Sequence, residues 1–225
     1  MLVKKQIALL SICILLLITV AYNIIGHRYI IMREQKAWPS GFYIVTIESS
    51  MDLTKQNAYF YQPNTSKTVP LLVSLHSWSG DYKQNDVLAK IATDKGWAYI
   101  HPDFRGPNNN PKAGVSQYVI SDIDDAIDYA MNTTPNIDKT RILVSGGSGG
   151  GLAALAVYMK SEHTLHAVNA WVPITDLIKW YEESLEREND YAKDILAITN
   201  SKDGKLDTDE AKRRSPIYWA TPLKT

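Results

Sequence analysis

The chain has 225 residues, enough for one globular domain with an N-terminal extension. Lysine and arginine number 24, as do aspartate and glutamate, so the formal net charge at pH 7 is zero. Such a balance argues against a polyelectrolyte partner, and we expect no nucleic-acid binding.

Residues 1–32 are interpreted as a membrane anchor or an export signal. Within them, residues 7–25 are almost wholly apolar and contain the only cysteine, Cys13. This run is long enough to cross a bilayer, and it also fits the hydrophobic region of a signal peptide. We therefore expect an extracytoplasmic protein anchored by this helix, or a secreted one if the signal is cleaved. Residues 33–41 are expected to link it to a domain over 42–225.

Several apolar runs predict the first strands of a sheet. Residues 42–48 and 57–62 are separated by a polar break and are expected to open a mixed sheet as an antiparallel pair. Residues 70–76 are continuously apolar, which is typical of a strand covered on both faces. A helix over residues 87–92 and a strand over 97–101 follow.

The loop after the strand at 70–76 carries the sequence His-Ser-Trp-Ser-Gly. In serine hydrolases with this layout, the corresponding loop donates one backbone N–H of the oxyanion hole. Trp78 is the candidate donor and Ser77 the alternative, while a plain turn with an aromatic plug also fits. His76 ends the strand, and we expect it to pack under the loop rather than act as a base.

A turn and a helix follow the strand at 97–101. Arg105 lies in the turn, where it is expected to fix the loop by bonding backbone carbonyls or a carboxylate. Apolar residues between 119 and 130 recur at i, i+3, i+4 and i+7, which predicts a helix with a core-facing stripe. Four acidic residues lie off that stripe, where a solvated helix face explains them without a metal ion: Asp122, Asp124, Asp125 and Asp128.

The strongest chemical signal lies between a predicted strand at 140–144 and a predicted helix at 152–160. The intervening residues, Gly-Gly-Ser-Gly-Gly at 146–150, fit G-x-S-x-G, the nucleophile elbow. A serine hydroxyl is a useful nucleophile only when it is held rigid and exposed beside a base. The motif therefore makes Ser148 the candidate nucleophile.

The glycines around Ser148 have separate expected roles. Strand and helix pass very close at such a turn, so Gly146 and Gly150 must be nearly free of side chain. Gly149 opens the helix and is expected to aim its N–H at a developing oxyanion.

A dinucleotide-binding turn is the main alternative, since residues 149–154 also fit G-x-G-x-x-A. That motif normally follows the first strand of a βαβ unit and precedes an acidic residue at the end of the next strand. Here several strands come first, and the strand at 167–172 ends without an acid. The elbow is favoured, and no organic cofactor is expected.

Four motifs occur in chain order, and together they resemble the catalytic domain of prolyl-oligopeptidase-type serine peptidases: Leu-His-Ser-Trp-Ser-Gly at 75–80, Pro-Asp-Phe-Arg-Gly at 102–106, Gly-Gly-Ser-Gly-Gly at 146–150 and Arg-Ser-Pro at 214–216. The resemblance covers residue 42 onward and implies an α/β-hydrolase fold, with a doubly wound, mostly parallel sheet. It also implies Ser148 as nucleophile, an oxyanion hole at Gly149 and Trp78, and peptide substrates. An esterase for carbohydrate or small esters is the runner-up.

The same resemblance implies an acid and a histidine after the Arg-Ser-Pro motif, near where the sequence stops. The histidines that follow Ser148, His163 and His166, lie at the wrong end of the layout for a base. Asp176 follows a strand but has no histidine to orient. We therefore expect a C-terminally truncated hydrolase that lacks its last strands, with a non-catalytic chain of the same fold as the alternative.

Overall fold

The computed structural model describes residues 38–219. The predicted anchor at 7–25, with Cys13, and residues 33–37 of the predicted linker at 33–41 lie outside the described residues. Within 38–219, no helix combines the length and the apolar character that a membrane span requires.

One mixed sheet of six strands, in the order β1-β2-β4-β3-β5-β6, organises the described residues. β1 and β2 pair antiparallel, as does β2 with β4, and the other neighbours are parallel. The prediction of a mostly parallel α/β sheet that opens on an antiparallel pair is thus confirmed. The strand bounds are β1 Tyr43–Glu48, β2 Lys55–Tyr61, β3 Val69–Leu75, β4 Ala98–Pro102, β5 Ile137–Gly147 and β6 Ala167–Trp171.

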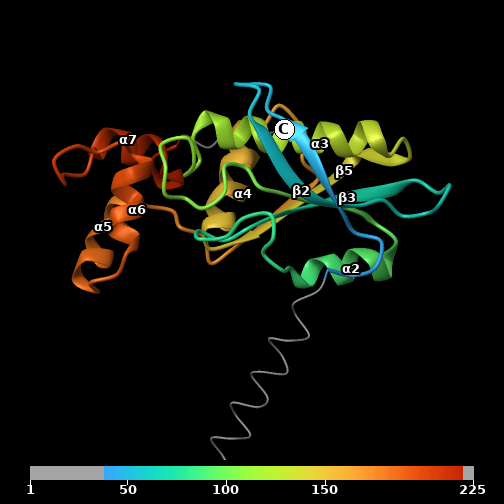
Figure 1. The fold of residues 1–225 in the computed structure, drawn as a ribbon, viewed down its shortest axis with the longest axis horizontal. Coiled ribbons are helices and arrows are strands. Elements are labelled where there is room, and N and C mark those ends of the chain that lie inside the picture. Colours follow the sequence, from blue (N-terminus) through green and yellow to red (C-terminus); the bar gives the residue numbers. More distant parts are fainter. Residues whose placement is uncertain (1–37, 220–225) are drawn as a thin grey trace, which may run out of the picture. The chain divides into compact units, whose positions relative to one another are not determined.

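A helix makes each of the connections from β3 to β6: α2 (Val87–Lys95), α3 (Gln117–Thr133) and α4 (Gly149–Lys160). Figure 1 shows α3 and α4 on one face of the sheet and α2 on the other. This two-sided cover explains why all seven residues of β3 are buried, and why that strand is apolar on both faces.

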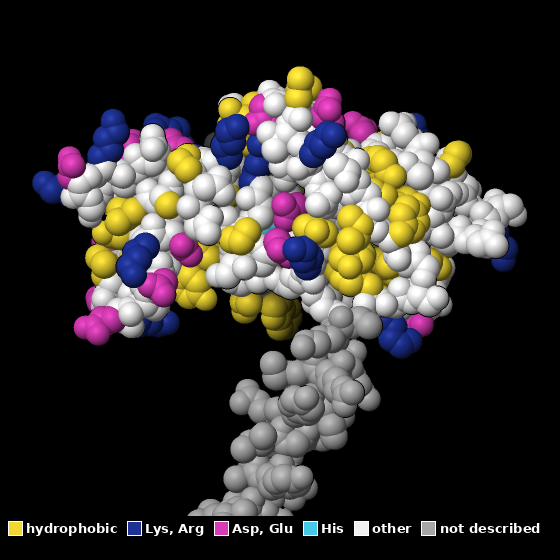
Figure 2. All heavy atoms as spheres, viewed as in Figure 1, with side chains coloured by type: hydrophobic (Ala, Val, Ile, Leu, Met, Phe, Trp, Pro, Cys, Tyr) yellow, Lys and Arg dark blue, Asp and Glu magenta, His cyan; other side chains and the backbone are white. Residues whose placement is uncertain are grey.

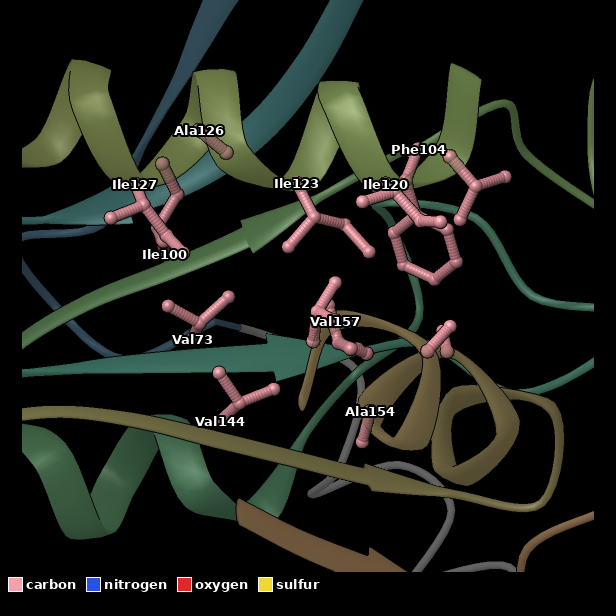
Figure 3. Close-up of a cluster of buried hydrophobic side chains, with 14 of the residues drawn as sticks. Val73, Ile100, Phe104, Ile120, Ile123, Ala126, Ile127, Val144, Ala154 and Val157 are labelled. Carbon is pink, nitrogen blue, oxygen red and sulfur yellow. The ribbon is translucent and has the colours of Figure 1, made fainter. Parts of the chain in front are cut away.

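The main hydrophobic core lies between the sheet and the pair α3 and α4 (Figure 3). Ile123 and Ile127 of α3 point toward Val73 and Ile100 of the sheet, and Val157 of α4 points into the same layer. All five side chains are fully buried. The stripe that predicted the helix at 119–130 is the face that fills this core.

Three further helices follow β6: α5 (Leu177–Glu186), α6 (Tyr191–Ile198) and α7 (Thr208–Arg213), with a 3₁₀ turn at Pro216–Tyr218. They lie together in Figure 1, coloured orange to red. Ile198 packs on the loop at 103–116, since a Cβ added at Gly114 would lie 2.5 Å from its Cδ1. Arg214 holds the same loop by donating to the carbonyl of Ala113 at 2.7 Å.

The visible surface carries charges of both signs, consistent with the balanced composition (Figure 2). A hydrophobic patch lies near β1 and β2 in this view. Tyr43 and Ile44 of β1 are among the exposed large apolar side chains. No large area of a single charge sign appears on this face.

A buried ion-pair network ties the loop between β1 and β2 to α3. Arg105 donates from Nε to Asp122 at 2.6 Å, from Nη1 to Asp52 at 2.9 Å and from Nη2 to the Ser49 hydroxyl at 2.7 Å. The prediction that Arg105 fixes its loop through a carboxylate is confirmed. The solvated face predicted for α3 is wrong for Asp122, which is 3% exposed, because the guanidinium covers it.

Replacing Asp122 with Asn should lower the free energy of unfolding by about 3 kcal/mol, because a buried guanidinium loses one of its two carboxylates. Urea denaturation followed by circular dichroism measures this. Asp128→Asn is the matched control: its side chain lies on the same helix and is 57% exposed. It should change stability by less than about 0.5 kcal/mol. Equal losses of stability in the two variants would contradict the stabilising role of the Arg105–Asp122 ion pair.

Candidate active site

Ser148 occupies the sharp turn between β5 and α4. Its backbone has φ 55° and ψ −117°, a left-handed conformation that costs free energy for a residue with a Cβ. Two backbone hydrogen bonds hold it there: Ser148 N–H donates to the Trp171 carbonyl at 2.9 Å, and Leu152 N–H donates to the Ser148 carbonyl at 3.0 Å. The side chain is half-buried, and its hydroxyl bonds to no residue in the described part of the chain.

Close backbone contacts explain the glycines on either side of Ser148. A Cβ at Gly146 would lie 2.2 Å from the Gly150 carbonyl oxygen, and one at Gly150 would lie 2.3 Å from the Leu75 carbonyl oxygen. Main-chain atoms cannot rotate out of the way, so any side chain would push α4 off the sheet. At Gly147 the nearest atom would be 3.8 Å away, so that position tolerates a side chain.

The loop after β3 rests against the first residue of α4. A Cβ at Gly149 would lie 2.5 Å from both the backbone nitrogen and the Cα of Trp78. The Gly149 N–H opens the helix and has no partner within it. The Trp78 N–H donates to no acceptor in residues 38–219. Two backbone donors therefore lie side by side next to Ser148.

The N–H of Ser77, the alternative donor, is already engaged. It donates to Gln84 Oε1 at 3.0 Å, and the Ser77 hydroxyl donates to the same oxygen at 2.6 Å. Of the two N–H groups that the sequence left open, only that of Trp78 is available to a ligand.

A model of the prolyl oligopeptidase family matches residues 83–222, a range that includes the whole of the Ser148 turn. This chain belongs to the prolyl oligopeptidase family. The match begins after the Trp78 loop, so the placement of that loop rests on the structure itself. A comparison with curated proteins gave no match.

Solved structures that resemble this family member share its fold at low sequence identity. Acylaminoacyl peptidase from Pyrococcus horikoshii is 17% identical with a TM-score of 0.59, over 79% of this chain and 29% of its own. Prolyl oligopeptidase B from Galerina marginata is 13% identical with a TM-score of 0.59, over 79% and 26%. A puromycin-hydrolyzing peptidase from Mycobacterium tuberculosis is 19% identical with a TM-score of 0.59, over 80% and 29%. The chain thus spans less than a third of the length of each.

The two histidines nearest the Trp78 loop in sequence are buried in this member of the family. Nε2 of His76 lies 2.7 Å from the Asp103 carbonyl oxygen, and its ring stacks on Phe104 with centroids 3.8 Å apart. Burial lowers the pKa of His76. The pKa of His101 is lowered to about 4, mainly by burial and also by the neighbouring His76. The prediction that His76 packs under the loop is confirmed.

The histidines after Ser148 lie at the opposite end of the sheet and of α4. His163 follows the C-terminus of α4, whose 12 residues span about 18 Å, and its Nε2 lies 3.5 Å from Asp128. His166 precedes β6, with its N–H bonded to the Ile142 carbonyl at 2.8 Å. Asp176 caps α5 by accepting from the N–H of Ile178 at 2.9 Å. None of these side chains hydrogen-bonds to Ser148.

Within residues 38–219, no group of three or more acidic, histidine or cysteine side chains is arranged to bind a metal ion. Three polar residues that support the Trp78 loop escaped the sequence analysis: Gln84, Asn108 and Asp194. None belongs to a motif. Gln84 lies in the same loop as Ser77, whereas Asn108 and Asp194 reach the loop only through tertiary folding. Asn108 stands in the run Asn108-Asn109-Asn110 of an irregular segment, which is its one weak signal.

Gly150→Ala should destabilise the protein by about 3 kcal/mol, because its methyl group would overlap the Leu75 carbonyl oxygen. Gly147→Ala is the matched control on the open side of the same turn, and it should stay within about 1 kcal/mol of the parent. Thermal and urea unfolding of both proteins measure the difference. Similar stabilities would show that the turn is looser than the described contacts require.

Proposed function

We propose that this chain carries the nucleophile of a serine peptidase that acts through an acyl-enzyme on Ser148. The observation that carries the proposal is the backbone of Ser148, held at positive φ by two hydrogen bonds beside the paired N–H groups of Gly149 and Trp78. A structural turn requires neither this strain nor two unused donors at one point. Membership of the prolyl oligopeptidase family supports a peptide substrate.

In the proposed reaction, Ser148 Oγ attacks the carbonyl carbon of a peptide or ester bond. A new C–O bond forms, the carbonyl oxygen takes up negative charge, and the N–H groups of Gly149 and Trp78 bind it. Collapse of this intermediate expels the amine or alcohol, and water then hydrolyses the acyl-enzyme. One such N–H donor typically contributes a factor of about 10² to 10³ in rate.

The reaction also needs a general base to accept the Ser148 proton. Of the described histidines, His76 is engaged by backbone carbonyls and His101 is buried. His163 and His166 lie between the C-terminal end of α4 and the start of β6, far from Ser148. In our proposal the base and its orienting acid therefore come from outside residues 38–219.

A fluorophosphonate probe tests this proposal directly. We expect slow labelling of the 225-residue chain, confined to Ser148, because no described histidine is placed to accept the Ser148 proton and a triad without its base loses most of its rate. Ser148→Ala should abolish labelling. Gly149→Ala should slow it about tenfold or more, because the methyl group would lie 2.5 Å from the Trp78 nitrogen and push the Trp78 loop away from the Gly149 N–H.

Gel fluorescence gives the rates, and mass spectrometry of the labelled peptide gives the site. Gly147→Ala is the matched control and should label like the parent, since it adds a methyl group away from both N–H groups. Labelling elsewhere, or labelling that survives Ser148→Ala, would remove Ser148 as nucleophile. Rapid labelling would mean that a group within the 225 residues serves as the base.

We also propose that the protein is held at a membrane through residues 7–25, with its domain on the extracytoplasmic side. The support is the length and apolar character of that run.

After expression of the full chain, the protein should stay in the membrane fraction through an alkaline carbonate wash and have the intact mass of the uncleaved chain. A variant that lacks residues 7–25 should be released, as the buried apolar surface that holds the protein would be gone. A soluble product of the parent chain that begins near Tyr22 would contradict the anchor and favour a cleaved signal.

A further inference from the structure

A carboxylate from α6 bonds to the side chain of Trp78. The Trp78 side chain is 3% exposed, and its indole Nε1–H donates to Asp194 Oδ2 at 3.0 Å. Trp180 of α5 packs edge-on against the indole, with ring centroids 4.6 Å apart and an interplanar angle of 84°. A buried indole N–H needs an acceptor, and here the acceptor lies 116 residues away in sequence.

The backbone on either side of the Trp78 N–H is also held by hydrogen bonds. The Ser77 carbonyl accepts from the Gly80 N–H at 3.0 Å, and it shares a planar peptide group with the Trp78 N–H. The Trp78 carbonyl accepts from the Asn108 backbone N–H at 2.9 Å and from its side-chain amide at 3.0 Å. The direction of the Trp78 N–H is thus fixed relative to the loop, and the indole contact fixes the loop relative to the helices.

α6 is a firm support for this contact, although it is only eight residues long. Ile195 and Ile198 of α6 are fully buried, and Ile198 packs on Gly114. The Gly114 N–H in turn donates to Asn108 Oδ1 at 2.7 Å. The loop at 103–116 therefore contacts both α6 and the Trp78 carbonyl. Asp194 accepts from the indole and Asn108 donates to the carbonyl, so the tryptophan is held from two sides.

We propose that Asp194 is a positioning residue, which acts through the Trp78 indole to keep the Trp78 N–H beside that of Gly149. This inference rests on the function proposed above for Ser148. An oxyanion donor is effective only within about 2.7–3.1 Å of the developing charge, and a misplacement of about 1 Å is costly. Without Asp194 the indole has no acceptor in its buried site, and the loop moves to find one.

The test compares second-order rates of fluorophosphonate labelling at Ser148. Asp194→Leu removes the acceptor, and Trp78→Phe removes the donor but keeps an aromatic ring. Each should slow labelling about tenfold, and the double variant should be no slower than either, because both break one interaction. Asp194→Asn keeps an acceptor oxygen and should remain within about threefold of the parent rate.

Asp190→Leu is the matched control. Asp190 precedes α6 and is 88% exposed. Among residues 38–219 it forms an ion pair only with Lys193, and its side chain makes no capping bond. This variant should label at the parent rate. A purely structural role for Asp194 would instead give additive losses in the double variant and no rescue by Asn.

A second readout does not depend on labelling. In ¹⁵N-tryptophan-labelled protein, the Trp78 indole N–H should exchange slowly with water in the parent and in Asp194→Asn, and rapidly in Asp194→Leu. Trp78→Phe identifies its signal among the 6 tryptophans.

The outcomes separate the two proposals. A parent chain that is not modified at Ser148 overturns the proposed function and with it the catalytic purpose of the contact, while indole exchange still reports whether the contact exists. A parent that labels at Ser148, with Asp194→Leu and Trp78→Phe equally fast, overturns the positioning role alone.

Discussion

The close approach of the first turn of α4 to the end of β3 is the constraint on which the site depends. Gly150 lies where any Cβ would meet the carbonyl oxygens of Leu75 and His76, and Gly146 lies where one would meet Gly150 itself. Because main chain meets main chain here, the connection from β5 to α4 has no room for a wider turn. The strained backbone of Ser148 is the consequence.

Around this contact the site is assembled from segments that are far apart in sequence. The loop after β3 brings Trp78, the loop at 103–116 brings Asn108, and α6 brings Asp194. Buried hydrogen bonds join them, and each is costly to break because its partner is left in a site that water does not reach. Membership of the prolyl oligopeptidase family is carried by residues 83–222, whereas the Trp78 loop precedes that range. The placement of the Trp78 loop therefore rests on the structure of this chain and not on the family match.

The parts that could be predicted from sequence are those set by local pattern. Continuous apolar runs predicted the covered strands, and spaced apolar residues predicted α3, since periodicity reports which face is buried. The burial of Asp122 could not be predicted in this way, because its cover is Arg105, which arrives from the preceding loop. The choice between two N–H groups of one loop likewise depended on Gln84, which occupies that of Ser77. Polar partners of this kind leave no periodic trace in the sequence.

The hydrogen bond from the Ser148 N–H to the Trp171 carbonyl links the strained turn to β6, the outermost strand of the described sheet on that side. Edge strands open more readily than central ones, since one side of their ladder is unpaired. When the end of β6 frays, Ser148 loses one of the two bonds that oppose its strain and can relax toward an ordinary backbone conformation. The geometry of Ser148 therefore depends on how firmly the end of β6 is held. A ligand that pairs along β6 and holds its end would also hold the strained backbone of Ser148, without touching its hydroxyl.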